Sequence, residues 1–229
     1  MHTSLRLIIL VSVTEPRPSK HAKATRTLTH GDASGDRRAA LIAIAAEMFA
    51  ERGYKGTTVR QIGDAAGVFS GSLYHHFESK ESIVDELLSE YLNQLLTSYR
   101  AIVAEQASPR EKLAELVRAA LKSLETHRAA IVVLQNERHE LGKLPRFTYL
   151  KDRESEIRDV WLEVIQAGIA QGELRDDLDP AIMYRFARDA IWVAVRWFQL
   201  DGKLTLDDVT DHYIALLIDG IGAGARHRT

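Results

Sequence analysis

The chain has 229 residues, 45% of them hydrophobic, and a formal net charge of −2. A chain of this length buries a large core in one or two domains. Its near-neutral charge excludes nucleic-acid binding through a global positive charge, so any such contact must come from a local patch. The absence of cysteine excludes disulfides and thiolate zinc sites, and it agrees with the cytoplasmic location that we expect.

Residues 1–36 are predicted to be a disordered N-terminal extension. The apolar run 5–13 is far shorter than the ~20 residues that span a bilayer, and no cleavage site of the form that a signal peptide needs follows it. Residues 15–36 are rich in Pro, Ser, Thr, Gly, Lys and Arg, which is typical of an unstructured tail or of a start placed too far upstream. The alternative is a basic arm that reaches DNA phosphates or the minor groove through Arg17, Lys20, Lys23 and Arg26.

From residue 37 onward the hydrophobic pattern is helical, and no alternating run is long enough for a strand. Gly53 and Gly67 are predicted to end helices. Capping residues mark the helix starts, namely Thr58 with Gln61, Ser79 with Glu81, Ser108 with Pro109 and Glu111, Asp179 with Pro180, and Thr205 with Asp208. This pattern predicts an all-α protein of about nine helices, with three short ones to residue 76, a long one over about 80–105 and five behind it.

Residues 57–77 carry the most informative pattern of the chain. Two short helices are predicted to meet at a tight turn at Gly67. Apolar residues occupy the positions where the two helices of a helix-turn-helix must touch, and small residues allow a close approach; these residues are Val59, Ile62, Ala65, Ala66 and Val68. The sequence therefore predicts a helix-turn-helix domain over 37–82.

The second helix of this motif is short and polar, so intrinsic propensity cannot stabilise it. Its hydroxyls and imidazoles can donate to phosphate oxygens or base edges in a major groove. Leu73 and Phe77 are expected in the core, and Tyr74 is expected half in the core. His75 and His76 diverge by about 100° on a helix and cannot chelate a metal together, so no metal site is predicted.

Positive charge is scarce in this domain, since residues 37–82 hold six Lys/Arg and five Asp/Glu. We therefore expect affinity to depend on hydroxyls, helix N-termini, a few cations and two half-sites.

The residues Thr57-Thr58-Val59, Ile62, Ala65, Gly67, Ser72-Leu73-Tyr74, His76-Phe77 and Lys80-Glu81 resemble the amino-terminal signature of the TetR family of regulators. The resemblance implies a three-helix DNA-binding domain, followed over 83–225 by a helical ligand-binding and dimerisation domain. It places the recognition helix at 70–76, with Thr58 and Lys80 gripping phosphate. The DNA-contacting residues that it implies are Thr57, Thr58, Ser70, Gly71, Ser72, Tyr74, His75, His76 and Lys80.

The final predicted helix, 206–221, is apolar on two faces. One stripe can cover the protein's own core, and a two-fold partner would naturally bury the other. The first stripe consists of Leu206, Val209, Tyr213, Leu216 and Gly220, and the second of Ile214, Leu217, Ile218 and Ile221. Small Ala215 and Gly220 would permit close packing. We therefore expect a homodimer and a palindromic double-stranded DNA operator.

The helix after Pro180 is apolar around most of its circumference, which predicts burial on nearly all sides. Its remaining sector holds Arg185, Arg188, Trp192 and Arg196. One interpretation is a solvent stripe in which Asp189 pairs with Arg185. The other, which the indole favours, is a pocket wall for a multiply charged anion with a flat or apolar body.

A coenzyme A thioester has this combination of phosphates, adenine and acyl group. The stretches 70–77, Pro145-Arg146-Phe147-Thr148-Tyr149 and 184–197 also resemble an actinobacterial TetR subgroup. Regulators of that subgroup repress later steps of cholesterol-ring catabolism and respond to a CoA thioester of a steroid-ring fragment. The resemblance implies that Arg188 and Trp192 bind the ligand, followed by Arg185 and Arg196. It offers Phe147, Tyr149 and Trp161 as apolar wall, although aromatic residues of this kind more often belong to the core.

The sequence thus predicts a ligand-released repressor with no cofactor and no membrane partner. An enzyme is the second hypothesis, but no metal-ligand helix motif, Gly-rich phosphate loop or nucleophile elbow is present. The clustered Glu137, His139 and Glu140 are weak evidence for one. A third hypothesis is a DNA-binding dimer that has no small-molecule ligand, that activates, or that answers to a protein partner. A repressor with a different apolar effector also agrees with the sequence.

Overall fold

The structure is a computed structural model that describes residues 33–199 and 201–222. The all-α prediction is confirmed, with eight α-helices and one 3-10 turn in this part of the chain. They are α1 (Ala33–Gly56), α2 (Val59–Ala66), α3 (Ser70–Leu73), α4 (Lys80–Ala104), α5 (Pro109–Leu141), η1 (Pro145–Phe147), α6 (Tyr149–Ala170), α7 (Pro180–Trp197) and α8 (Leu206–Ile221). The predicted basic arm and the apolar run 5–13 lie outside the described residues.

The predicted helix starts are confirmed by their capping contacts. Side chains of the N-cap and N3 residues satisfy each other's backbone N–H groups at the starts of α2, α5 and α8. Asp179 accepts from the N–H groups of Ala181 and Ile182 at the start of α7. Ser79 caps α4, where the reciprocal partner is Ser82.

The helix boundaries differ in places from the predicted ones. Gly53 was expected to end the first helix, but the chain turns there with φ 76° and ψ 162° and resumes helical structure to Gly56. The same helix begins at Ala33, inside the segment 1–36 assigned to the extension. α5 continues through a kink at His127, and four α-helices and η1 follow α4, where five helices were expected.

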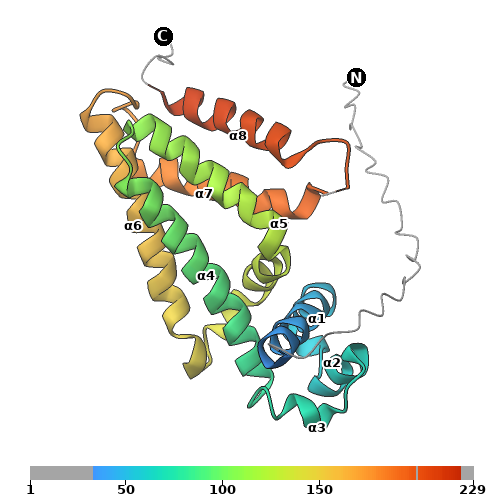
Figure 1. Cartoon of the computed structure of the whole chain (residues 1–229). Coiled ribbons are helices and arrows are strands. Elements are labelled where there is room, and N and C mark those ends of the chain that lie inside the picture. The colour runs from blue at the N-terminus through green and yellow to red at the C-terminus, as the bar shows by residue number, and fades with distance from the viewer. Residues whose placement is uncertain (1–32, 200, 223–229) are drawn as a thin grey trace, which may run out of the picture. The chain divides into compact units, whose positions relative to one another are not determined.

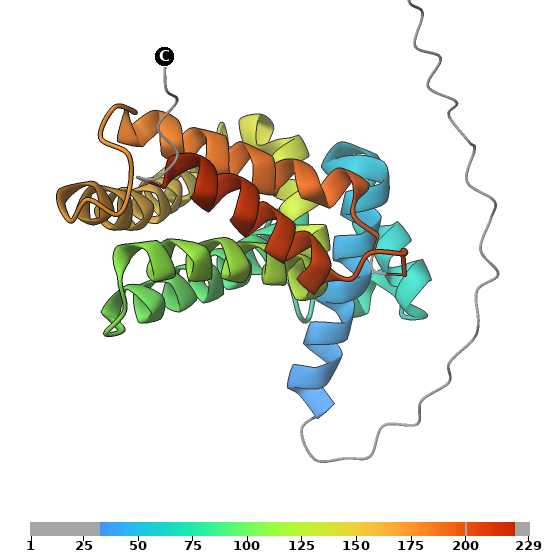
Figure 2. The same ribbon diagram turned by 90° about the horizontal axis from the view of Figure 1, so that it is seen from above.

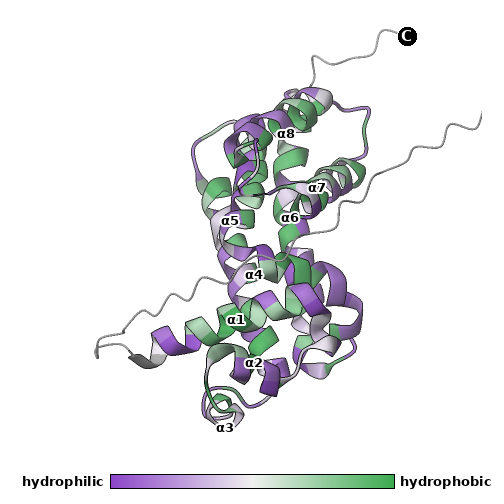
Figure 3. Cartoon of the chain, turned by 90° about the vertical axis from the view of Figure 1, so that its right-hand side faces the viewer, coloured by the Kyte–Doolittle hydropathy of each residue, from purple (hydrophilic) through white to green (hydrophobic). Residues whose placement is uncertain are grey.

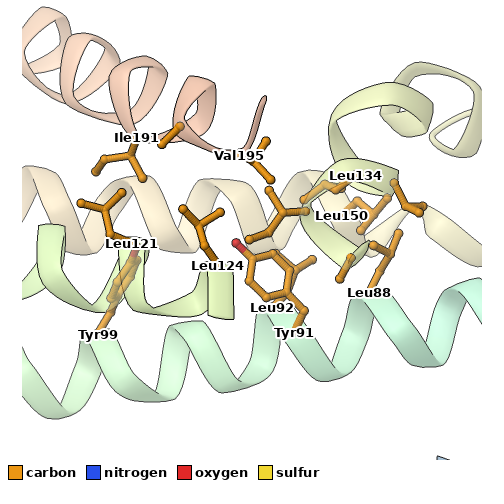
Figure 4. Close-up of a cluster of buried hydrophobic side chains, with 14 of the residues drawn as sticks. Leu88, Tyr91, Leu92, Tyr99, Leu121, Leu124, Leu134, Leu150, Ile191 and Val195 are labelled. Carbon is orange, nitrogen blue, oxygen red and sulfur yellow. The ribbon is translucent and has the colours of Figure 1, made fainter. Parts of the chain in front are cut away.

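The core lies between α4, α5, α6 and α7, and α1–α3 gather around the N-terminal end of α4 (Figure 1). Leucines and tyrosines at helical spacing supply most of it, among them Leu88, Leu92 and Tyr99 on α4 and Leu121 and Leu124 on α5 (Figure 4). Phe49, Ile62 and Leu73 extend the same core into the first three helices. No helix in the described part of the chain is both long and apolar enough to cross a bilayer.

The prediction that α7 is buried on nearly all sides is wrong for the single chain. Ala187, Ile191, Ala194 and Val195 face the core, but four large apolar residues point outward, namely Ile182, Phe186, Val193 and Trp197. α8 lies beside α7 (Figure 2), yet these four side chains stay exposed, and Figure 3 colours both helices by the hydropathy of their residues. The periodicity identified the apolar circumference correctly, but it could not tell which side the chain itself covers.

Gly67 occupies the left-handed region (φ 67°) that closes the turn between α2 and α3. Replacing it with Ala forces a Cβ into this conformation, and we expect the free energy of unfolding to fall by about 1 kcal/mol. Gly71 has an ordinary φ and open space around its Cα. Gly71→Ala should therefore leave stability unchanged or raise it. Denaturant unfolding of both variants tests this prediction, and equal losses would contradict it.

Candidate DNA interface and ligand cavity

The turn between α2 and α3 is held by backbone contacts. The N–H of Gly67 donates to Asp64 O, and the N–H of Val68 donates to Gly63 O at 2.9 Å. A Cβ on buried Gly63 would stand 3.0 Å from Val68 O, so the two segments pack as closely as backbone allows. This geometry fixes the direction of α3 relative to α2, as a helix-turn-helix requires.

The predicted recognition segment 70–76 has an exposed polar face. Gly71, Tyr74 and His75 are exposed. Ser70, Ser72 and His76 are half-buried, and Thr58 is exposed at the start of α2. Leu73 and Phe77 are buried as expected. The helix proper covers only Ser70–Leu73, and the rest of the segment continues as a turn.

Thr57 is an exception among the predicted DNA contacts, because it is fully buried. Its hydroxyl donates to Met48 O at 3.1 Å and to Gly53 O at 3.0 Å, which ties together the kinked end of α1. The hydroxyl therefore faces the interior and has no path to DNA. Thr57 and Thr58 are adjacent residues of the same type, so the sequence does not show that one is buried and the other exposed.

Lys80 was expected to grip phosphate at the start of α4. Its ammonium instead donates to Tyr54 O at 2.8 Å and Thr57 O at 3.0 Å, and it lies over the Tyr54 ring. Burial lowers the pKa of Lys80. In this arrangement the charge satisfies carbonyl groups at the end of α1 instead of pointing to solvent, so the geometry argues against a phosphate contact.

Three helices meet where Lys80 lies. The Tyr54 hydroxyl donates to Glu81 of α4 at 2.5 Å, and the Tyr54 N–H donates to Glu137 of α5 at 3.0 Å. Lys55 pairs with Glu140 at 2.9 Å. Two carboxylates of the polar cluster that gave weak evidence for an enzyme thus fasten α5 to the end of α1. We name this group the α1–α4–α5 junction.

Arg38 is a positioning residue that the sequence did not reveal. Its guanidinium bonds both carboxylate oxygens of Glu86 on α4, donates to His76 O, and lies 4.3 Å from the centre of the Phe77 ring. It thus fixes the end of the recognition segment against α4. Its partners lie 38 to 48 positions away in the sequence, which is why no local pattern pointed to it.

These contacts reduce further the positive charge available for DNA. Arg38, Lys55 and Lys80 are engaged within the protein, and Arg60 lies 4.0 Å from Asp64. The recognition segment itself contains no lysine or arginine. Contacts from α3 must therefore depend on neutral groups and histidines.

A cavity of about 510 Å³ lies between α4, α5, α6 and α7. Its floor is apolar and aromatic, with Leu92 and Tyr99 from α4, Leu124 and Leu134 from α5, and Ile191 from α7 (Figure 4). Trp161 of α6 completes the floor and packs edge-on against Tyr99, with ring centres 5.9 Å apart. Pockets of this size and lining hold small organic ligands.

Cationic side chains from three helices line the same cavity, namely Arg138 of α5, Lys151 and Arg158 of α6, and Arg185 and Arg188 of α7. The guanidinium of Arg188 lies 6.0 Å from the Trp192 ring and 5.7 Å from the Tyr184 ring. Asp189 pairs with Arg188 at 2.7 Å, not with Arg185 as the solvent-stripe interpretation required. The result is an apolar chamber with a positively charged border.

The structure brings together four of the seven predicted ligand residues, since Arg185, Arg188, Trp192 and Trp161 all line the cavity. The other three lie elsewhere. Phe147 is buried in the core. The Tyr149 hydroxyl donates to Asp85 O at 3.4 Å, outside the cavity lining. Arg196 is exposed in the last turn of α7, where the helix has turned away from the chamber.

Glu154 is a cavity residue that sequence reasoning missed. It lies on the same face of α6 as Lys151 and Arg158, and one of its oxygens accepts from Arg138. The other oxygen is buried and has no hydrogen-bond donor among the described residues. Burial raises the pKa of Glu154, and the nearby Arg138 and Arg188 oppose that rise. The cavity therefore contains an acceptor as well as cations.

Comparisons with known proteins identify the family of the two domains that hold these candidate sites. Residues 41–87 match the bacterial regulatory proteins of the tetR family, and residues 106–221 match the tetracyclin repressor-like C-terminal domain. The chain is 48% identical to the HTH-type transcriptional repressor KstR2 of Mycobacterium tuberculosis over 81% of this chain and 92% of that protein. It is 44% identical to KstR2 of Rhodococcus jostii, over 84% and 95%.

Solved structures give the same result. The ketosteroid transcriptional regulator KstR2 of Mycobacterium tuberculosis superimposes with a TM-score of 0.79 at 47% identity, covering 81% of this chain and 95% of that one. AibR, solved with isovaleryl coenzyme A and operator DNA, has a TM-score of 0.71 at 22% identity, covering 80% and 98%. The likeness to AibR shows the fold alone.

The chain therefore belongs to the TetR family, and it is a helix-turn-helix transcriptional repressor, not an enzyme. Within that family it is similar to the KstR2 repressors of actinobacteria.

The Lys80 geometry predicts an effect on stability and not on phosphate contacts. Lys80→Met removes two charge-assisted hydrogen bonds to carbonyl groups, so we expect the free energy of unfolding to fall by roughly 2 kcal/mol. The slope of log affinity for DNA against log salt should stay unchanged, whereas loss of a phosphate contact would reduce it by about 1. Lys122→Met, an exposed lysine of α5, serves as the control and should change stability by less than about 0.5 kcal/mol.

Proposed function

We propose that this repressor binds a palindromic operator in the cytoplasm as a homodimer and releases it when a CoA thioester enters the cavity. The observation that carries the proposal is the cavity itself, in which an apolar floor adjoins arginines of three helices. An apolar carbon skeleton fits the floor, while the planar guanidinium groups of arginine suit bidentate binding of phosphates. The acyl group that we propose is a steroid-ring fragment, as the resemblance to the cholesterol-catabolism repressors implies.

Two relatives support this assignment of ligand class. KstR2 of Mycobacterium tuberculosis is described as a ketosteroid transcriptional regulator. AibR, which has the same fold, holds isovaleryl coenzyme A together with operator DNA. A cavity of about 510 Å³ accommodates a fused-ring acyl group and part of the pantetheine arm. The nucleotide end would then lie at the charged border, where Trp192 offers a stacking face.

The proposed route from ligand to DNA runs along α4. Tyr91, Leu92 and Tyr99 of this helix line the cavity, while Lys80 and Glu81 at its start hold the end of α1. Arg138 at the cavity also neighbours Glu137, which accepts from the Tyr54 N–H. A ligand releases DNA only by as much as it prefers the conformation that does not bind DNA. Movement of α4 and α5 at the cavity supplies such a conformation by displacing the helix-turn-helix.

The effector site is tested with Arg188→Ala and Trp192→Ala. Both variants should keep operator affinity in fluorescence anisotropy, because neither residue is near α3. Removal of the Arg188 contact should raise the CoA-thioester concentration needed for half-release by about tenfold or more. Arg196→Ala is the matched control, since Arg196 lies on the same helix outside the cavity lining, and its response should equal that of the unmodified protein.

The contrary outcomes are distinct. Undiminished operator binding at saturating thioester in the unmodified protein would remove the induction mechanism and favour a ligand-independent regulator. Unfolding of both variants, seen by circular dichroism, would assign Arg188 and Trp192 to the fold instead of to a ligand.

The proposed dimer face combines α7 and α8. Phe186 and Ile182 on α7 and Leu216 on α8 keep 68%, 65% and 76% of their surface exposed. Trp197 stacks on Tyr213, and the Tyr213 hydroxyl donates to Ala190 O at 2.9 Å, so the two helices present one continuous surface. Exposed Ala215 and Gly220 allow close approach of a partner. Apolar residues gathered in this way indicate a protein interface.

Phe186→Glu places a charge in the centre of this face. We expect the dimer dissociation constant in analytical ultracentrifugation to rise by at least about 30-fold, the loss typical of a central interface residue. Operator affinity should fall with it, because a monomer occupies only one half-site. Asn93→Glu, at an exposed position of α4, is the control and should remain dimeric. A Phe186→Glu protein that stays dimeric would place the interface elsewhere.

A further inference from the structure

Phe69 is the most exposed large apolar side chain in the described residues, with 89% of its surface accessible. It stands at the N-cap of α3, directly before Ser70 and Gly71. Exposing a phenyl ring to water is unfavourable, and nothing in the described fold covers this one. Folding of the single chain therefore does not explain why this position carries a phenylalanine.

The position of Phe69 at the start of α3 is also unusual for a phenylalanine. An N-cap usually carries Ser, Thr, Asp or Asn, whose oxygen accepts from the first turn of the helix. At α3 no side-chain cap exists, because phenylalanine cannot accept a hydrogen bond. The protein thus gives up both a helix cap and the burial of an aromatic ring at one residue of its recognition segment.

The surroundings of Phe69 also allow close contact with a flat partner. Gly71 is exposed and a Cβ on it would meet nothing within 4 Å. Tyr74 and His75, which follow in the same segment, are exposed as well. The segment contains no lysine or arginine, so contacts with base edges must come from neutral groups and histidines. In the major groove, the apolar group that a base presents is the C5-methyl group of thymine.

We propose that Phe69 is a specificity-determining residue that packs against the C5-methyl group of one thymine in each operator half-site. This inference rests on the proposed DNA-binding role of the segment 70–76. The contact reads thymine against cytosine and against uracil, because only thymine carries the methyl group. It compensates for the scarce positive charge by adding apolar burial that ordinary salt does not screen.

The test replaces thymines by uracils one at a time in an operator fragment selected from random duplexes, with the full-length chain as binder. In the unmodified protein, fluorescence anisotropy should find one thymine per half-site whose replacement weakens binding about fourfold, as loss of one buried methyl predicts. In Phe69→Ala and Phe69→Ser this penalty should vanish. The serine can cap α3, so this variant should be at least as stable as the unmodified chain and excludes unfolding as the cause.

Tyr74→Ala is the matched control, since it removes another exposed aromatic of the same segment. It should weaken operator binding but keep the uracil penalty. A uracil series without effect on the unmodified protein, or a penalty that persists in Phe69→Ser, would overturn the inference. If variants at Phe69, Tyr74 and His75 all bind the operator normally, the proposed DNA-binding role of the segment fails instead.

Discussion

The arrangement of this repressor depends on how the end of α1 is held. After the kink at Gly53 the backbone exposes polar groups that the helix no longer satisfies, and these groups must find partners. Lys80 from α4 supplies donors, Glu137 from α5 supplies an acceptor, and the Thr57 hydroxyl bonds the carbonyl of Gly53 itself. Since α4 and α5 also line the cavity, one junction attaches the helix-turn-helix to the helices around the proposed ligand site.

Local chemistry was readable from the sequence. The capping pairs Thr58–Gln61 and Thr205–Asp208, the turn at Gly67 and the cap-plus-proline start at Asp179 all rest on contacts within five residues, so they appear as short patterns. The all-α class follows from the same periodicity. The break at Gly53 was expected from the glycine, but the helical turn that continues to Gly56 and the kink at His127 were not, because packing decides whether a helix ends or bends.

Side-chain roles set by distant partners could not be predicted in this way. Thr57 and Lys80 have residue types that suit phosphate contacts, yet the structure turns both toward carbonyls of α1. Arg38 and Glu154 were missed because Glu86 and Arg138, their partners, lie on other helices. The arginines around Trp192 were found because they share one helix face, and for the same reason Arg196 was included although α7 carries it away from the cavity.

α7 has two occupied faces. Arg188 and Trp192 line the cavity, and Phe186 and Val193 are exposed on the proposed dimer face. A change that reshapes α7 for a new effector therefore shifts the surface by which two subunits recognise each other. In the proposed dimer, effector recognition and subunit recognition are therefore coupled through the position of one helix.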